Sequence, residues 1–548
     1  MPSGGHRPAA LLLALATACA HVETAPSAAP ARAAADEAPA ASAPPADPGA
    51  ARLAAIRAEV EDLLGAQGAL LWETWTRGTP SDLDTTLAAH AALFSRETVS
   101  FVREAHGRAT GDEARALALL HAFLVGEHLS RAGDAAARDD GQPSFDWDGQ
   151  RVLAARAPSL LAAEPSAQRR AALSRAWAEA ERRQGPAARR RRDAMAAAAQ
   201  ALGYRSLAAL GAELRGDSLD ALAALADGVL AATDATYRAL VDALARSEVG
   251  RALADLRGCD LPRVLRAGDD RRLFPADRSG ADARAVLAGV GLELADRPGV
   301  VIDDAARPGK DARALTLPVA VPGDVRLSYA PAAGISELRG LLHELGAAAF
   351  YSRVEAVPQE FRRMGAVTAE TWSRLFADLA GDPRWLEERT GATGHELAPV
   401  VRATAARRLH VARLLAAHVL DEVARDRDPK AGAAARARLE RALLRTAADD
   451  ELQRFVADRD PLLQGADLLR ALLLAAQADA FLSARADGAW WRSPLAGAWL
   501  AAAFAEGSRR SPVDLARALG AERVDATALA ASTRARLAAA GLQVAASP

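Results

Sequence analysis

Apolar side chains recur with helical spacing over most of the chain between residues 53 and 290. Later apolar stretches are interrupted by Arg, Asp or Glu within a few turns, as between Leu414 and Leu439, which is typical of amphipathic helices and not of membrane spans. The pattern therefore predicts a mainly α-helical body. Glycine and proline predict breaks at Gly107, residues 141–143, Gly185-Pro186 and residues 258–262.

A different pattern appears before residue 335. Short apolar or alternating runs, bounded by proline and glycine, cover residues 299–303, 315–318 and 325–329. Runs of this length and composition predict β-strands. We therefore expect one small sheet within the helical body.

The N-terminus has the features of an export signal. Arg7 is followed by an apolar run from Ala9 to Ala18 and then by Cys19. Small residues before a cysteine predict a bacterial lipoprotein signal, residues 1–19, with Cys19 lipidated; an ordinary secretory signal cut near Ala20 is the alternative. The run is too short for a stable membrane span. Either reading places the mature protein outside the cytoplasm.

Residues 20–52 contain mainly Ala, Pro, Ser and acidic residues, with almost no large apolar side chain. Such a segment cannot bury enough surface to fold, so it is predicted to be a disordered tether with a reach on the order of 100 Å. Ala20 stands where an aspartate commonly retains lipoproteins at the inner membrane. We therefore expect a lipid anchor at Cys19 in the outer membrane of the cell envelope, with the protein facing the periplasm.

Charge and cysteine content exclude several classes of function. The 68 basic side chains are balanced by 70 acidic ones, so no nucleic-acid partner is expected. If Cys19 carries the anchor, only Cys259 remains. A mature chain with one cysteine has neither an intramolecular disulfide nor a zinc site built on several cysteines.

The most informative motif is His343-Glu344-Leu345-Gly346-Ala347. In a zinc-peptidase H-E-x-x-H helix, two histidines four residues apart lie on one helix face and bind zinc, while the glutamate polarises a metal-bound water. Here Ala347 stands in place of the second histidine. With the strands expected before it, the motif suggests a zincin-like arrangement in which the sheet edge flanks a cleft.

From about residue 201 to residue 529 the chain resembles the thimet oligopeptidase and oligoendopeptidase F family of zinc metallopeptidases. The resemblance implies a zincin-like helical fold with a small sheet beside a central cleft, and it divides the chain into an N-terminal helical region, 53–200, and a catalytic-domain homologue, 201–545. It also implies that His343 and Glu370 are metal ligands and that Glu344 is the general base. The matching segments are residues 202–207, 303–314, 321–325, 336–350, 361–376, 460–471 and 490–497.

Two parts of the family's machinery are missing. Ala347 offers no ligand, whereas a catalytic zinc normally needs three from the protein. Family members also use C-terminal tyrosines, often with a histidine, to stabilise the oxyanion, yet no tyrosine follows Tyr351 and no histidine follows His418. As a replacement ligand, Arg339 would repel a cation and Tyr351 is a rare zinc ligand. His410 and His418, eight residues apart on another helix, remain possible substitutes.

These observations favour a non-catalytic homologue of a zinc oligopeptidase, anchored in the envelope and serving as a peptide-binding or scaffold module, with His343, Glu344 and Glu370 vestigial and no cofactor expected. The alternative is an active zinc metallopeptidase that takes a ligand from elsewhere. A third hypothesis is a helical envelope protein that acts outside the cleft, with a related active protein as its partner.

Overall fold

The computed structural model describes residues 47–137, 142–266, 268, 271–295 and 297–542. The predicted signal, Cys19 and most of the predicted tether lie outside these residues. The described part is mainly helical and contains two small sheets, which confirms the mainly α fold with a small sheet. None of its helices combines the length and apolar content that a membrane crossing requires.

The first described segment is a helix, α2, which begins at Pro48. Five residues assigned to the tether, 48–52, are therefore helical, and the tether prediction was wrong at that end. Pro48 at the first helical position and an Asp47 side chain that accepts a hydrogen bond from Gly49 N (2.8 Å) favour a helix start here. The N-terminal region consists of α2 (Pro48–Arg77), α3 (Leu83–Ala89), α4 (Arg96–Arg108), α5 (Gly111–Ala136), β1 (Ser144–Trp147), β2 (Gln150–Leu153), α6 (Ala157–Ala163) and α7 (Ala167–Ala201).

Two features of this region differ from the helical prediction. The antiparallel hairpin of β1 and β2 interrupts the helices. The break expected at Gly185-Pro186 is absent, because α7 continues through Pro186. An internal proline costs a helix about 3 kcal/mol. Buried residues on both sides of Pro186, such as Leu173 and Met195, show that packing along α7 outweighs this cost.

The predicted strands form the second sheet. It has the order β3 (Val300–Asp303), β5 (Asp324–Ser328), β4 (Leu315–Ala320), with β3 parallel and β4 antiparallel to β5. On one side of β4, Leu315, Leu317 and Val319 pack against Trp72 of α2. The opposite side faces α12 (Ile335–Tyr351), through Thr316. The sheet therefore lies directly against the helix that carries the His-Glu motif.

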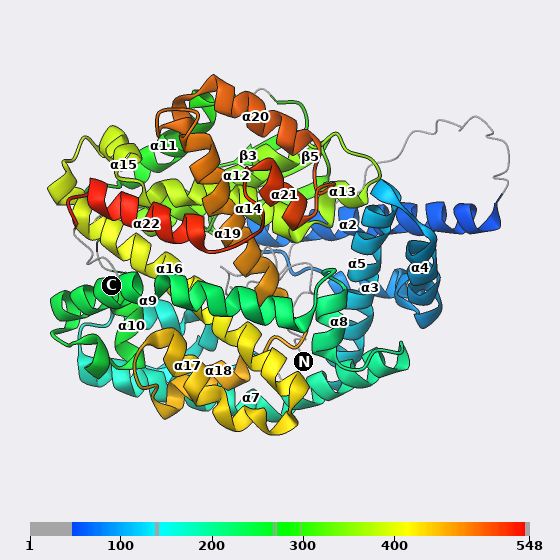
Figure 1. Ribbon diagram of the computed structural model, residues 1–548, viewed down its shortest axis with the longest axis horizontal. Coiled ribbons are helices and arrows are strands. Elements are labelled where there is room, and N and C mark those ends of the chain that lie inside the picture. The colour runs from blue at the N-terminus through cyan, green and yellow to red at the C-terminus, as the bar shows by residue number, and fades with distance from the viewer. Residues whose placement is uncertain (1–46, 138–141, 267, 269–270, 296, 543–548) are drawn as a thin grey trace.

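Helix α12 packs against α14 (Ala366–Ala377), and the remaining helices complete the body of the molecule. In Figure 1, α12, α14 and α20 lie on one side of the view and α7, α17 and α18 on the other. Helix α16 packs against α17, and its Arg407 donates a hydrogen bond to Ser336 of α12. The helices whose bounds have not yet been given, together with one 3-10 turn, are α8 (Leu207–Glu213), α9 (Leu219–Val249), α10 (Leu261–Leu265), α11 (Ala276–Gly289), α13 (Glu360–Arg363), the 3-10 turn η5 (Asp378–Gly381), α15 (Pro383–Thr390), α16 (Gly394–Arg427), α17 (Ala435–Leu443), α18 (Asp449–Ala457), α19 (Gln464–Ser483), α20 (Pro494–Ala505), α21 (Pro512–Ala518) and α22 (Thr527–Ala539).

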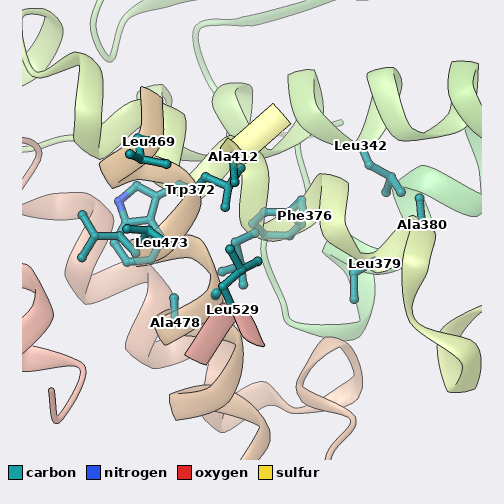
Figure 2. Packing of buried hydrophobic residues seen from close by; sticks show 14 of the residues in the cluster. Leu342, Trp372, Phe376, Leu379, Ala380, Ala412, Leu469, Leu473, Ala478 and Leu529 are labelled. Carbon is teal, nitrogen blue, oxygen red and sulfur yellow. The ribbon is translucent and has the colours of Figure 1, made fainter. Parts of the chain in front are cut away.

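The main hydrophobic core fixes the position of α14. Figure 2 shows Trp372 and Phe376 of this helix among Leu469 and Leu473 of α19 and Leu529 of α22. Trp372 and Phe376 are fully buried. Because one face of α14 is held in this core, its polar residues are kept on the side that faces α12. A second, smaller core joins α2, α4 and α5 to residues on both sides of position 200, so the division of the chain there stays a prediction.

Candidate functional site

Helices α12 and α14 approach each other closely at Gly346. A Cβ atom at this position would lie 2.9 Å from Phe376 Cδ2 and 3.0 Å from the carbonyl oxygen of Trp372, both of which are closer than normal contacts. Glycine is therefore required for the observed packing. This close approach brings His343, one turn before Gly346, to the polar side of α14 where Glu370 lies.

The His343 ring lies between two carboxylates. Its Nδ1 is 3.1 Å from Glu344 Oε1, and its Nε2 is 3.3 Å from Glu370 Oε2. The imidazole side chain keeps 27% exposure, whereas the two carboxylate side chains keep 10% and 8%. The structure thus brings together all three residues that the family resemblance assigned to the site.

The charges of these neighbours decide the protonation of His343. Burial by itself would lower the pKa of His343, but the negative charge of Glu370 and hydrogen bonds to Glu344 and Glu370 outweigh it and raise the pKa to about 9. Burial would likewise raise the pKa of Glu370, but Arg374 and His343 lower it to about 2. Near neutral pH, His343 is therefore an imidazolium beside an ionised Glu370.

The remaining carboxylate oxygens also have partners within the chain. Glu344 Oε2 accepts a hydrogen bond from Thr316 N at 2.7 Å, and Thr316 Oγ1 donates to the carbonyl oxygen of Glu344 at 2.7 Å. Arg374, one turn after Glu370 on α14, places Nη2 2.7 Å from Glu370 Oε1. Glu344 thus joins α12 to β4, and Glu370 joins α12 to α14.

This arrangement does not fit a catalytic zinc. Such a zinc needs three protein ligands, and only two of those that the resemblance assigns, His343 and Glu370, are at hand here. Ala347 is 3% exposed and packs in the main core, where it supplies no donor atom.

Neither substitute histidine joins this group. His410 Nδ1 lies 2.9 Å from the Tyr237 hydroxyl of α9, and burial, together with Arg445 and Arg413, lowers the pKa of His410 to about 3. His418 stacks on Phe455 of α18 with ring centroids 4.3 Å apart. Both side chains therefore have partners on elements other than α12 and α14.

The edge of β4 offers little to an extended peptide. Thr316 N is already bonded to Glu344, and Pro318, which faces the same way two residues later, has no N–H to donate. A strand added at this edge would lack both donors. The sheet edge beside the motif is present as predicted, but its hydrogen-bonding capacity at these two positions is used or absent.

Two hollows lie elsewhere in the molecule. One, of about 630 Å³, is lined by Arg205, Asp217, Asp220 and Asp426 among others, at the ends of α8 and α16. Several of its charges are already paired, as in the contact between Arg205 and Asp426 at 2.7 Å. The other, of about 420 Å³, lies between the β1–β2 hairpin and α7. Neither hollow is lined by His343, Glu344 or Glu370.

The sequence analysis did not identify Arg374 and Thr316, which contact the carboxylates of Glu370 and Glu344. A signal for Arg374 existed, because an acidic residue followed four positions later by arginine on a helix commonly forms an ion pair. Thr316 has no such signal, since its contact with Glu344 joins a strand to a helix.

A comparison with models of known protein families finds no match to this chain, and a comparison with curated proteins finds none either.

Proposed function

We propose that this chain is a non-catalytic homologue of the thimet oligopeptidase and oligoendopeptidase F zinc peptidases, anchored in the bacterial envelope through Cys19. In this proposal it serves as a peptide-binding or scaffold module. The resemblance in sequence supports it, together with the convergence of His343, Glu344 and Glu370 on one point between α12 and α14.

One observation carries the loss of catalysis. All four carboxylate oxygens of Glu344 and Glu370 contact groups of the chain itself, namely Thr316 N, Arg374 and the two ring nitrogens of His343. Proton transfer from water to Glu344, or a bond from Glu370 to a metal, would therefore compete with contacts that already hold α12 to β4 and to α14. In this site both oxygens of each residue serve to hold neighbouring elements together.

The absence of oxyanion donors supports the same conclusion. The sequence has no tyrosine after Tyr351, and Tyr351 itself is buried, with 6% exposure. Loss of one such donor typically lowers kcat about 10²-fold. Combined with an incomplete metal site, this deficit makes ordinary peptide hydrolysis negligible.

Metal analysis of the purified protein, with a peptide-cleavage assay and an Ala347→His variant, tests the proposal. We expect less than stoichiometric zinc and no chelator-sensitive cleavage in the native chain. The variant should gain zinc affinity, because His343 and Glu370 already converge, yet remain almost inactive. Tight one-to-one zinc in the native chain, with cleavage that Glu344→Gln abolishes, would instead establish an active metallopeptidase with a remodelled site.

A further inference from the structure

Helix α20 presents an entirely apolar face to solvent. It is the one α-helix in the described part of the chain that has no charged, hydroxyl or amide side chain. In Figure 1 it lies at the outer edge of the molecule, on the opposite side from α7 and α17. A helix that is apolar on all sides is normally buried. One face of α20 therefore lacks the cover that its composition requires.

The inner side of α20 is held in place by the rest of the fold. Gly497 packs so closely on Val290, directly after α11, that a Cβ atom at this glycine would clash with the Val290 carbonyl oxygen. Phe504 packs edge-on against Phe350 of α12, with ring centroids 5.7 Å apart. Because these contacts fix the helix, its outer residues cannot turn inward, away from water.

The outer face of α20 is a stripe made of Leu495, Ala498, Trp499 and Ala502. Leu495 is 80% exposed, the highest value among the exposed large apolar side chains in the described part of the chain. Ala498 and Ala502 are also exposed. Trp499 is partly exposed at one border, because its ring packs on Phe481 of α19 with centroids 4.9 Å apart. The stripe is therefore continuous over two turns of the helix.

The order of side-chain sizes along the stripe fits a second copy of the same stripe. Leu495 and Ala502 are seven residues apart, which is about 10.5 Å along the helix axis, and they lie on almost the same line of the helix surface. If two copies of α20 pack antiparallel about a two-fold axis between Ala498 and Trp499, each large Leu495 meets the small Ala502 of the other copy. The two helices can approach closely at Ala498, where the side chain is a methyl group.

Charges at the two ends of the stripe favour the same antiparallel arrangement. Arg492 precedes α20 and Glu506 follows it, with 60% and 33% of their side chains exposed. Within its own chain, Arg492 is paired with Glu388 at 2.6 Å, and Glu506 is paired with Arg510 at 2.6 Å. An antiparallel pair brings Arg492 of each copy to Glu506 of the other and joins these ion pairs into networks. A parallel pair would bring like charges together.

We infer that α20 is a self-association surface and that its partner is α20 of a second copy of this chain. The inference goes beyond the proposed function and does not depend on it, because the stripe contains none of the residues assigned to the metal site. A lipid surface fits the stripe less well. Helices that lie in a bilayer surface expose Trp, Phe and Leu, whereas two of the four residues here are alanine.

The size of the stripe sets the strength of the contact. Two helix faces of this length bury less than the roughly 1,600 Å² of a standard protein interface, so we expect a weak dimer with a Kd on the order of 10 to 100 µM.

Cysteine crosslinking of the full chain, in intact cells treated with a membrane-permeable oxidant, tests the contact and its register. Ala498→Cys should give a disulfide-linked dimer, because the two substituted positions face each other across the two-fold axis. Leu495→Cys alone should not, because its two copies would lie about 10.5 Å apart along the axis. Leu495→Cys expressed together with Ala502→Cys should again give the dimer.

Two controls give the background of this experiment. The native chain under the same oxidant reports any crosslinking through Cys19 or through Cys259, which is buried. Ala535→Cys places a thiol at an exposed alanine of α22, outside the stripe, and should give no dimer above that background. Equal crosslinking of Ala498→Cys and Ala535→Cys would overturn the inference.

A charge placed in the stripe tests whether apolar contact drives the association. Leu495→Arg, combined with Ala498→Cys, should lower the crosslinked fraction about fivefold or more, because the dimer would bury a charge without a partner. Because Leu495 is so exposed, Leu495→Arg should unfold at the same urea concentration as the native chain. Val411→Arg is the matched control, since Val411 is 37% exposed on α16, and it should leave the crosslinked fraction unchanged.

The other possible occupants of the stripe give different results. A crosslink from Ala498→Cys to another protein in place of the dimer would overturn the inference. A nitroxide on Ala498→Cys that oxygen reaches in membranes, but a water-soluble nickel complex does not, would assign the stripe to lipid. Crosslinking that survives Leu495→Arg would show that the dimer forms elsewhere.

Discussion

His343 on α12 and His410 on α16 are both surrounded by protein, yet their pKa values are shifted in opposite directions, so that the first ring is protonated and the second is neutral. His343 lies between the carboxylates of Glu344 and Glu370, and its pKa is raised to about 9. His410 faces the Tyr237 hydroxyl, with Arg445 and Arg413 nearby, and its pKa is lowered to about 3. Burial favours the neutral ring in both places, so the sign of the neighbouring charges makes the difference.

This contrast shows that the two histidines serve different roles. An imidazolium between two carboxylates supplies a positive charge at this point and ties α12 to α14. A neutral imidazole with one hydrogen bond fills space between α16 and α9. The residue type alone does not determine the charge state of either ring, because partners from other elements of the fold decide it.

Among these variants, Glu370→Gln should lower the free energy of unfolding most, because Glu370 is one of the two carboxylates that make the surroundings of His343 differ from those of His410. In Glu370→Gln, Arg374 and His343 lose their shared counter-charge in a site that is largely closed to water. Breaking a buried pair on one side typically costs about 3 kcal/mol. Urea unfolding measures the change. The matched control is Glu337→Gln, an exposed glutamate on α12, which should cost less than about 0.5 kcal/mol. Equal effects in the two variants would contradict the role given to Glu370.

The pH dependence of the free energy of unfolding should distinguish the two histidines, because the folded-state pKa of His343 lies above pH 7 and that of His410 lies below it. The folded-state pKa of His343 is above the ordinary 6.5, so its stabilisation is complete below pH 6.5 and is lost as pH rises towards 9. The folded-state pKa of His410 is below 6.5, so its stabilisation is complete above pH 6.5 and is lost as pH falls towards 3.

We therefore expect His343→Gln to flatten the alkaline side of a plot of unfolding free energy against pH, and His410→Gln to flatten the acid side, each by an amount on the order of a few kcal/mol. The exposed His395 provides the control, and His395→Gln should change neither side. An alkaline side that stays unchanged in His343→Gln would show that this ring is not protonated in the folded state.

Separating α12 from α14 should weaken one histidine site and leave the other unchanged. Gly346→Ala places a methyl group 2.9 Å from Phe376, and such overpacking costs about 2 kcal/mol. Gly340→Ala on the same helix meets nothing within 4 Å and should stabilise by about 0.5 to 1 kcal/mol. Thermal unfolding gives both signs. In Gly346→Ala the pKa of His343 should also fall towards its ordinary value while that of His410 stays low.

The smallest effects concern single hydrogen bonds at the two sites. Tyr237→Phe removes the hydroxyl that faces His410, and Thr316→Val removes the hydroxyl that donates to the Glu344 carbonyl. Each should lower the free energy of unfolding by about 1 kcal/mol. The double variant should show additive losses, because the two sites share no partner. A clear deviation from additivity would mean that the two histidine sites are coupled.

The sequence predicted the helical class and the three strands before residue 335, because these follow from periodicity and from the positions of proline and glycine. It named His343 and Glu370 as metal ligands only through the resemblance, and the structure places the two side chains together. It missed the helix start at Pro48, where a capping aspartate and a proline outweigh an alanine-rich composition. It also assigned a break at Pro186, where packing along α7 decides instead. The bond from Thr316 to Glu344 could not be predicted, because it depends on how a strand edge meets a helix in space.

The most direct test is an NMR titration of the His343 ring in the intact protein with labelled histidine, using His343→Gln to assign its signals. We expect both ring nitrogens to be protonated at pH 7, a transition near pH 9, and no change when one equivalent of zinc is added. A neutral ring at pH 7 whose signals move with stoichiometric zinc would contradict the proposal that His343 forms an internal ion pair at this site and does not bind a metal ion.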